Sequence, residues 1–248
     1  MISIKTQEEI ETMRRGGAIL AEILDQLEAA ARPGVQTMEF DRLARELLAS
    51  FGAKASFLGY NGFPATLCVS INEEVVHGLP SERTLKDGDV LKLDFGVLCD
   101  GYHTDSARTV IIGAGDTKKQ KLLDTTRQAL EIGIAQARAG NTIGDIGHAI
   151  ETYVKSQGFD VVRDLIGHGI GKSLHEEPEV PNYGKKGKGP VLEPGMTIAI
   201  EPMVVEKGWQ VKEGPDGFSY VTKDGGLAIH EEHTVAITEG EPLILTQK

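Results

Sequence analysis

The chain has 248 residues, of which 40% are hydrophobic and 25% are charged, and its formal net charge is -11 at pH 7. Such a chain can bury a substantial core as one large domain or two fused halves. The negative charge argues against binding to nucleic acid or to an anionic membrane surface. No stretch is long and apolar enough to span a bilayer.

The chain contains two cysteines, Cys68 and Cys99, and neither belongs to a C-x-x-C pair. They predict no disulfide framework, and a reducing compartment fits them best. The N-terminal stretch MISIKTQEEIETMRRGG has neither the apolar run nor the cleavage site of a signal peptide. We therefore expect a cytoplasmic protein.

The N-terminal region is expected to form two helices. Thr6 to Glu9 reads T-x-x-E, a capping box, and apolar residues then follow at helical spacing. This pattern predicts a helix from about Thr6 to Ala31, which Pro33-Gly34 ends. A second amphipathic helix is predicted from roughly Met38 to Ser50, and Gly52 is expected to end it.

The helical pattern returns later in the chain. Residues 31–52 and 137–158 align without gaps, 106 residues apart, and the alignment pairs Gly34 with Gly140. A second repeat pairs residues 85–94 with residues 192–201, 107 residues apart. Each copy of the second repeat is a turn glycine followed by an apolar strand that ends in a carboxylate.

The two repeats together indicate one internal duplication. We expect an α+β fold with two pseudo-symmetric halves, each with a helix pair on a curved antiparallel sheet. The halves would cover roughly residues 1–113 and 114–248 of a single catalytic domain. Asp94 and Glu201 would then occupy matching places, one in each half.

A predicted hairpin brings a second aspartate close to Asp94. Asp100-Gly101 is a strong turn signal. With this turn, Asp94 faces Ala107, and Asp105 lies on the same face of the sheet as Asp94. The two carboxylates are then within reach of a shared ion.

The aspartate pair by itself would fit a solvated sheet face, or ion pairs with Lys92 or Arg108, at least as well as an ion site. The second half changes the balance, because Glu201, Glu231 and Glu232 also border apolar strands. Several carboxylates that converge without matching lysines need a multivalent cation, since close like charges cannot all stay ionised.

The stretch LIGHGIGKSLHEEPEVP, from Leu165 to Pro181, contains the letters GKS of a phosphate-binding loop. That loop requires a glycine five positions before Gly171, and Ile166 stands there, so nucleotide binding is disfavoured. His168 could instead add a nitrogen to the carboxylates and make a site for two divalent ions. Taken alone, any one histidine fits a structural, hydrogen-bonded role better than a ligand role.

Five motifs in the chain resemble one known family: YNGFPATLCVSINEEVVHGLP from Tyr60, LKLDFGVLCDGYHTDSARTV from Leu91, IGHGIGKSLHEEPEVPNYG from Ile166, MTIAIEPM from Met196 and HEEHTVAIT from His230. They are similar, in order and spacing, to the type I methionine aminopeptidases, whose fold is called pita-bread. Aminopeptidase P, prolidase and creatinase usually carry an additional N-terminal domain, and the type II methionine enzymes an insertion in the second half. We expect this chain of 248 residues to have room for neither addition, and we therefore expect the type I activity.

The resemblance implies two divalent metal ions, of cobalt, manganese, iron or zinc, held by five side chains. Asp105 and Glu232 would bridge the ions, Asp94 would bind the second, and His168 with Glu201 would complete the first. A hydroxide that bridges the ions would attack the first peptide carbonyl.

The resemblance also implies three catalytic residues: Glu201 relays a proton, His175 contacts the scissile carbonyl, and His77 contacts the substrate near the next residue. The glycines of the stretch would let the backbone bend so that His168 and His175 reach their places. This chain has Leu174 where many relatives have an aromatic residue, and Phe218 at the position of the family's late pocket tryptophan. The methionine pocket would be formed by Tyr60, Phe63, Cys68, Leu174 and Phe218.

The expected substrates are peptides and nascent chains with an N-terminal methionine. A transient contact with the ribosome and a monomeric state are also expected. Two alternatives stay open. One is an Xaa-Pro aminopeptidase of the same fold, and the other is a non-catalytic binding protein that kept the fold and lost the metals.

Overall fold

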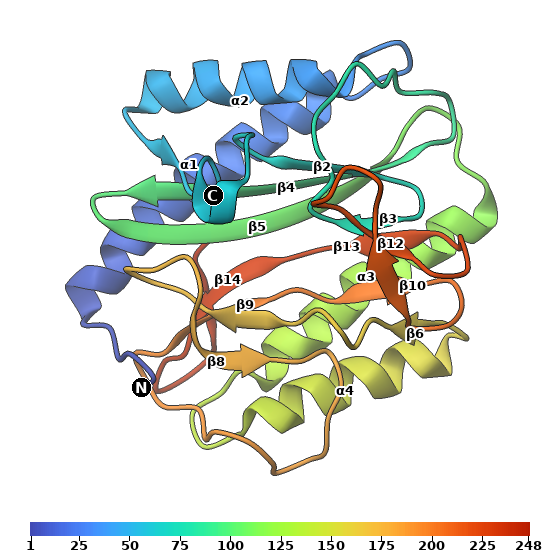
Figure 1. Cartoon of the computed structure of the whole chain (residues 1–248). Coiled ribbons are helices and arrows are strands. Elements are labelled where there is room, and N and C mark those ends of the chain that lie inside the picture. The colour runs from blue at the N-terminus through green and yellow to red at the C-terminus, as the bar shows by residue number, and fades with distance from the viewer.

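The computed structural model describes residues 1–248, in which two helix pairs enclose the strands. The first half contributes α1 (Gln7–Ala30) and α2 (Thr37–Phe51), and the second contributes α3 (Thr117–Gln136) and α4 (Ile143–Ser156). In Figure 1, α2 and α4 lie at opposite ends of the molecule with strands between them. None of the helices is long and apolar enough to cross a membrane.

The predicted ends of the first two helices are confirmed. Thr6 caps α1 with a complete capping box, and the helix stops at Ala30, shortly before Pro33. The C-cap of α2 is Gly52, which adopts the left-handed conformation at φ 67°. The apolar stripes of α1 and α2 pack with the first-half strands into one core, and α3 and α4 pack with second-half strands into another.

The first-half sheet contains the predicted hairpin. Strands β4 (Val90–Cys99) and β5 (Tyr102–Ile111) pair over ten residues, with β1 (Lys54–Ala55) and β2 (Cys68–Ile71) on the other side of β4. Asp94 faces Ala107, as the Asp100-Gly101 turn requires.

The second half has shorter strands in separate sheets. One sheet has the order β15-β14-β9-β7-β8, another the order β13-β10-β6, and a third joins β11 and β12 to the first-half strand β3. The strand bounds are β3 (Glu74–Val76), β6 (Asp160–Val161), β7 (Gly167–Gly169), β8 (Glu176–Val180), β9 (Thr197–Ile200), β10 (Met203–Val205), β11 (Val211–Glu213), β12 (Tyr220–Thr222), β13 (Ala228–His230), β14 (His233–Ala236) and β15 (Leu243–Ile244), and a short 3-10 helix η1 covers Tyr60–Gly62.

Hydrogen bonds join the halves along β5 and β14. The Asp105 amide donates to Thr234 Oγ1 over 2.9 Å, and the Thr234 hydroxyl donates back to the Asp105 carbonyl over 2.8 Å. The Glu232 amide donates to the Ala107 carbonyl over 3.0 Å. These bonds fix Asp105 beside Glu232, so that a carboxylate from each half reaches the same point.

Matching contacts occur in the connection between the two helices of each pair. The Gly34 amide donates to the Leu85 carbonyl and the Gly140 amide to the Leu192 carbonyl, each over 2.9 Å. Both glycines have positive φ, 91° and 89°, which glycine adopts without a steric penalty. This agreement supports the proposed internal duplication.

Candidate active site

A cavity of about 200 Å³ lies between the halves, and every residue expected at the site lines it. The first half brings Asp94 and Asp105 from adjacent strands. The second half brings Glu201 from the end of β9 and Glu232 from the connection between β13 and β14. The remaining lining residues are Phe57, Tyr60, Asn61, Phe63, Cys68, His77, His168, Leu174, His175 and Phe218.

Burial makes the four carboxylates costly to ionise. Loss of water raises the pKa of Asp94 to about 6 and that of Glu201 to about 8. Burial also raises the pKa of Asp105 and Glu232 well above the ordinary range, and the neighbouring carboxylates add to the effect. The set therefore favours protons or a cation in its centre.

The alternative of ion pairs with Lys92 or Arg108 is wrong. The Lys92 ammonium donates to the Asn72 carbonyl over 2.9 Å and to the Ala228 carbonyl over 3.0 Å. Arg108 points away and pairs with Asp25. The carboxylate cluster thus has no lysine or arginine partner.

The ligand set fits a divalent cation. Asp105, His168 and Glu232 each offer an atom, and these atoms lie within 4.8 Å of one another. Asp105 Oδ1 and Glu232 Oε1 are buried without a hydrogen-bond partner, an arrangement that a cation would relieve. Oxygen-rich sets with one imidazole suit divalent first-row metals.

His168 is oriented to offer its Nε2 lone pair. Its Nδ1 lies 2.9 Å from the Gly169 carbonyl, which can only accept, so the proton belongs on Nδ1. Nε2 then faces Glu201 Oε1 at 3.7 Å. Burial lowers the pKa of His168 to about 3 and keeps the ring neutral, as a metal ligand must be.

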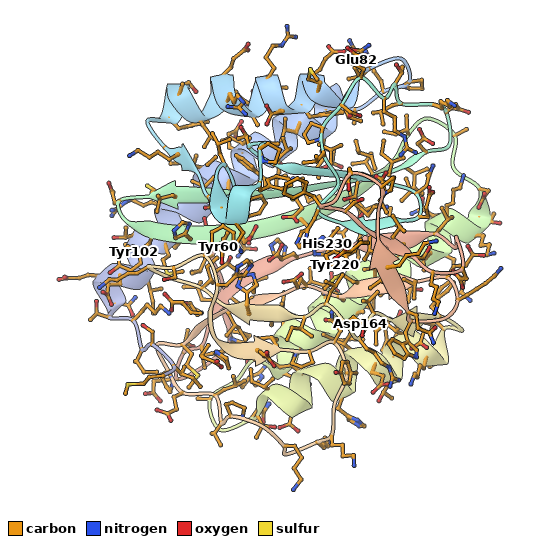
Figure 2. The ribbon with its side chains drawn as sticks, viewed as in Figure 1. Tyr60, Glu82, Tyr102, Asp164, Tyr220 and His230 are labelled. Atoms are coloured by element: carbon orange, nitrogen blue, oxygen red, sulfur yellow. The ribbon has the colours of Figure 1, made fainter.

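His175 and His77 approach the cavity from opposite halves. His175 Nδ1 lies 2.7 Å from the Tyr60 hydroxyl, and its ring centroid lies 4.2 Å from that of His168. His77 has φ 60°, an unfavourable conformation for a non-glycine residue that typically marks a functional position. Its ring meets Tyr220 edge to face, and Figure 2 shows Tyr60 and Tyr220 near the seam between the halves.

The expected pocket residues form an apolar wall. Phe63 meets Phe218 edge to face with ring centroids 5.6 Å apart. Leu174 and Cys68 are buried beside them in the same cluster. Trp209 lies elsewhere, with its ring 5.6 Å from the Arg163 guanidinium, and does not replace the missing pocket tryptophan.

Sequence reasoning missed His230. This buried residue ends β13, and its Nε2 lies 3.3 Å from Glu201 Oε2 (Figure 2). Neither ring nitrogen makes a hydrogen bond. Its place two residues before Glu232 was visible in HEEHT, but only the sheet register brings it to Glu201. Phe57 and Asn61 were also missed as lining residues.

The glycines around His168 have a packing role that was not expected from the sequence. Gly167, Gly169 and Gly171 do not adopt positive φ, and His168 lies on a strand paired with β8. A Cβ on Gly167 would lie 2.4 Å from the Ala199 carbonyl oxygen, and one on Gly169 would lie 2.1 Å from that of Glu177. Gly167 and Gly169 therefore permit close strand packing, while the pairing of β7 with β8 is irregular between His168 and Gly169 and Gly171 lies in a bend.

Comparisons with known proteins agree with this geometry. The model of metallopeptidase family M24 matches residues 11–239. Methionine aminopeptidase from Clostridium acetobutylicum is 50% identical over 99% of both chains, and methionine aminopeptidase 1 from Bacillus subtilis is 46% identical over 100% of both. The crystal structure of methionine aminopeptidase from Thermotoga maritima superposes with a TM-score of 0.98 at 43% identity and covers all of both chains.

The chain therefore belongs to metallopeptidase family M24, and within it to the type I methionine aminopeptidases. The expected pita-bread fold is confirmed, as is the expectation of a hydrolase with aminopeptidase activity. Membership also implies the use of divalent metal. Prolidase from Pyrococcus furiosus, with a TM-score of 0.77 at 23% identity, shares the fold, and this chain covers 65% of it.

Proposed function

We propose that the protein removes N-terminal methionine from peptides and nascent chains, with Asp94, Asp105, His168, Glu201 and Glu232 as metal ligands. The observation that carries this proposal is the pair of unpartnered buried oxygens, Asp105 Oδ1 and Glu232 Oε1, which face one cavity from opposite halves. Because Asp105 and Glu232 line the same cavity from opposite halves, they are suited to bridge two ions.

Divalent cations in this set would polarise the scissile carbonyl and lower the pKa of a water molecule. The side chains supply the remaining steps. Glu201 would take the proton from the attacking water and pass it to the leaving amine. The Glu201 carboxylate lies between His168 and His230, whose Nε2 atoms are 3.7 Å and 3.3 Å from its two oxygens.

His175 would stabilise the charge that develops on the carbonyl oxygen. If the Tyr60 hydroxyl donates to Nδ1 across the 2.7 Å contact, Nε2 keeps its proton and can donate to that oxygen. His77 would contact the substrate near its second residue, and its neighbour Tyr220 limits the positions that its ring can take.

The apolar wall of the cavity suits an unbranched thioether side chain. Phe63, Cys68, Leu174 and Phe218 line one region, and Tyr60 stands at its rim with 37% of its surface exposed. Methionine is flexible and makes favourable sulfur contacts with aromatic rings. Leu174, in place of an aromatic residue, would make the pocket wider without removing its apolar character.

We infer cobalt, manganese, iron or zinc as the metal, because the mixed carboxylate and imidazole set accepts each of them. We also infer a cytoplasmic monomer that contacts the ribosome transiently when it meets nascent chains. The two free cysteines fit a reducing compartment.

The function is tested by comparing hydrolysis of Met-Ala-Ser with that of an Xaa-Pro peptide in the metal-loaded protein. We expect release of methionine, with little cleavage of the Xaa-Pro bond. Preference for the Xaa-Pro peptide would indicate the other dinuclear peptidase activity. A metal-loaded protein that hydrolyses neither peptide, and whose metal content is unchanged by Asp105→Ala, would indicate a non-catalytic binding protein.

A further inference from the structure

We propose that Lys5 and Glu176 form a buried clamp that positions His175 for the reaction, an inference that rests on the proposed role of His175. Lys5 Nζ lies 2.7 Å from Glu176 Oε2, and the two side chains are only 3% and 14% exposed. Glu176 directly follows His175 in the sequence. The clamp therefore acts on the backbone that carries this histidine.

The turn from Ile170 to His175 is tied to its surroundings at several points, among them the bond from the His103 amide to the Gly171 carbonyl over 2.8 Å. The turn joins β7 to β8 and lies outside both strands, and His175 itself is exposed. Within it, the Gly171 amide donates to the Ser173 carbonyl over 3.1 Å. A short turn with one internal hydrogen bond does not by itself fix a side chain within the fraction of an ångström that catalysis needs.

The clamp fixes the turn at several points. Glu176 Oε2 binds Lys5, while Glu176 Oε1 accepts the Ser173 amide over 3.0 Å. Lys5 is held in turn through its own amide, which donates to the Gly195 carbonyl over 2.8 Å. The Lys5 side chain passes so close that a Cβ on Gly171 would lie 2.5 Å from Lys5 Cε. The N-terminal segment, the turn and the start of β9 thus form one unit.

The burial of this pair favours a positioning role over a purely stabilising one. A buried ion pair often stabilises a fold no more than apolar side chains of similar volume would, because both charges lose their hydration. What the pair adds is a single geometry, since the ammonium and carboxylate must meet at hydrogen-bond distance. Here that geometry is imposed one residue from His175.

A second ion pair on the same turn provides a matched control. Lys172 Nζ lies 3.2 Å from Glu9 Oε1, but its side chain is 71% exposed. An exposed pair contributes little to structure. Both pairs join the N-terminal region to the turn, but only the Lys5–Glu176 pair is shielded from solvent, adjoins His175 and accepts the Ser173 amide.

The test combines Lys5→Met with His175→Ala in a double-mutant cycle on the metal-loaded protein, with Met-Ala-Ser as substrate. We expect Lys5→Met to lower kcat roughly 10- to 100-fold, the range for a catalytic group displaced by about 1 Å. KM and metal content should stay unchanged, while amide exchange of residues 170–176 becomes faster. In the His175→Ala background, Lys5→Met should have no further effect on kcat. Lys172→Ala should leave all these quantities unchanged.

Three results separate the possibilities. If His175→Ala leaves kcat unchanged, the proposed role of His175 is wrong and the clamp has nothing to position. If His175→Ala lowers kcat but Lys5→Met has no effect, or the same effect in both backgrounds, only the clamp proposal is overturned.

Because Lys5→Met leaves Glu176 as a lone buried charge, the double variant Lys5→Met/Glu176→Leu is the check on folding. It should keep the melting temperature and still show the low kcat.

Discussion

At the end of the first-half repeat, Asp94 lies in the middle of the ten-residue strand β4, with Lys92 two residues before it. At the matching place in the second half, Glu201 follows the four-residue strand β9, with Ala199 two residues before it and an imidazole on either side. The matched backbones supply oxygen ligands at matching points. The residues around them differ: a buried lysine, Lys92, accompanies Asp94, whereas the imidazoles of His168 and His230 flank Glu201.

This comparison separates what holds the site together from what makes it chemically asymmetric. The long hairpin and Lys92 fix the first half, because the ammonium bonds carbonyls from both halves. The short strands of the second half leave room for the turn that carries His175. A substrate between the halves would meet carboxylates on both sides, with His77 on the first-half side and His175 on the second-half side.

The most severe prediction removes a carboxylate at the point where the halves meet. Asp105→Asn should lower kcat/KM roughly 1000-fold, because a misplaced metal ion loses several kcal/mol of transition-state stabilisation. Metal content measured by elemental analysis should fall in parallel. Full activity with normal metal content would show that the ions do not depend on the seam between β5 and β14.

His175→Ala tests the asymmetric side of the site. We expect kcat to fall about 100-fold, the typical effect of losing one donor to a developing oxyanion. Metal content should not change, since His175 is not one of the five proposed ligands. A parallel loss of metal would instead make His175 a ligand.

Lys92→Met tests how the halves are joined. The substitution leaves the carbonyls of Asn72 and Ala228 without their donor, so the free energy of unfolding should fall by roughly 2 kcal/mol. Chemical denaturation of the metal-loaded protein would measure this loss. The matched substitution at Ala199, to Ser, adds a hydroxyl but removes no hydrogen bond and should cost less.

Relative to its Glu201→Gln variant, the metal-free protein should lose stability as pH rises from 7 to 9. Burial raises the pKa of Glu201 to about 8 in the folded state, so the folded protein holds a proton that the unfolded chain has already lost. The loss should be about 1 kcal/mol across that range. Lys92 opposes this trend, because burial lowers its pKa to about 7 while the unfolded chain still binds its proton. The histidines oppose it only below about pH 6.5. Denaturation of the unsubstituted protein and of Glu201→Gln should therefore differ in slope by the Glu201 contribution, and equal slopes would contradict it.

The smallest expected effect concerns the pocket. Leu174→Phe should narrow the apolar pocket that Leu174 and Phe63 both line. We expect KM for Met-Ala-Ser to change by only a few-fold, because such changes in a hydrophobic pocket are worth about 1 kcal/mol. The ratio of kcat/KM for methionine and norleucine peptides would report it. A large loss of kcat would show that Leu174 also positions its neighbour His175.

Local patterns predicted much of this fold. The Thr6 capping box and Gly52 fixed the ends of the first two helices, and the Asp100-Gly101 turn fixed the register that sets Asp94 opposite Ala107. These features depend on neighbours in sequence. The division of the second half into short sheets was not predicted, because pairings such as that of β3 with β12 join distant segments.

The site residues also divide into those that the sequence predicted and those that it did not. The cluster of carboxylates could be inferred from repeats and apolar strands. His230 and Lys5 could not, because their roles depend on which distant side chains the fold places within 3.3 Å and 2.7 Å of them. No spacing in the sequence encodes those contacts.

The most direct measurement of the central claim is a crystal structure of the cobalt-loaded protein with anomalous diffraction data at the cobalt edge. We predict two cobalt peaks in the cavity, both touching Asp105 and Glu232, one completed by His168 with Glu201 and the other by Asp94. An active, cobalt-loaded crystal with its peaks outside this carboxylate set would contradict the account.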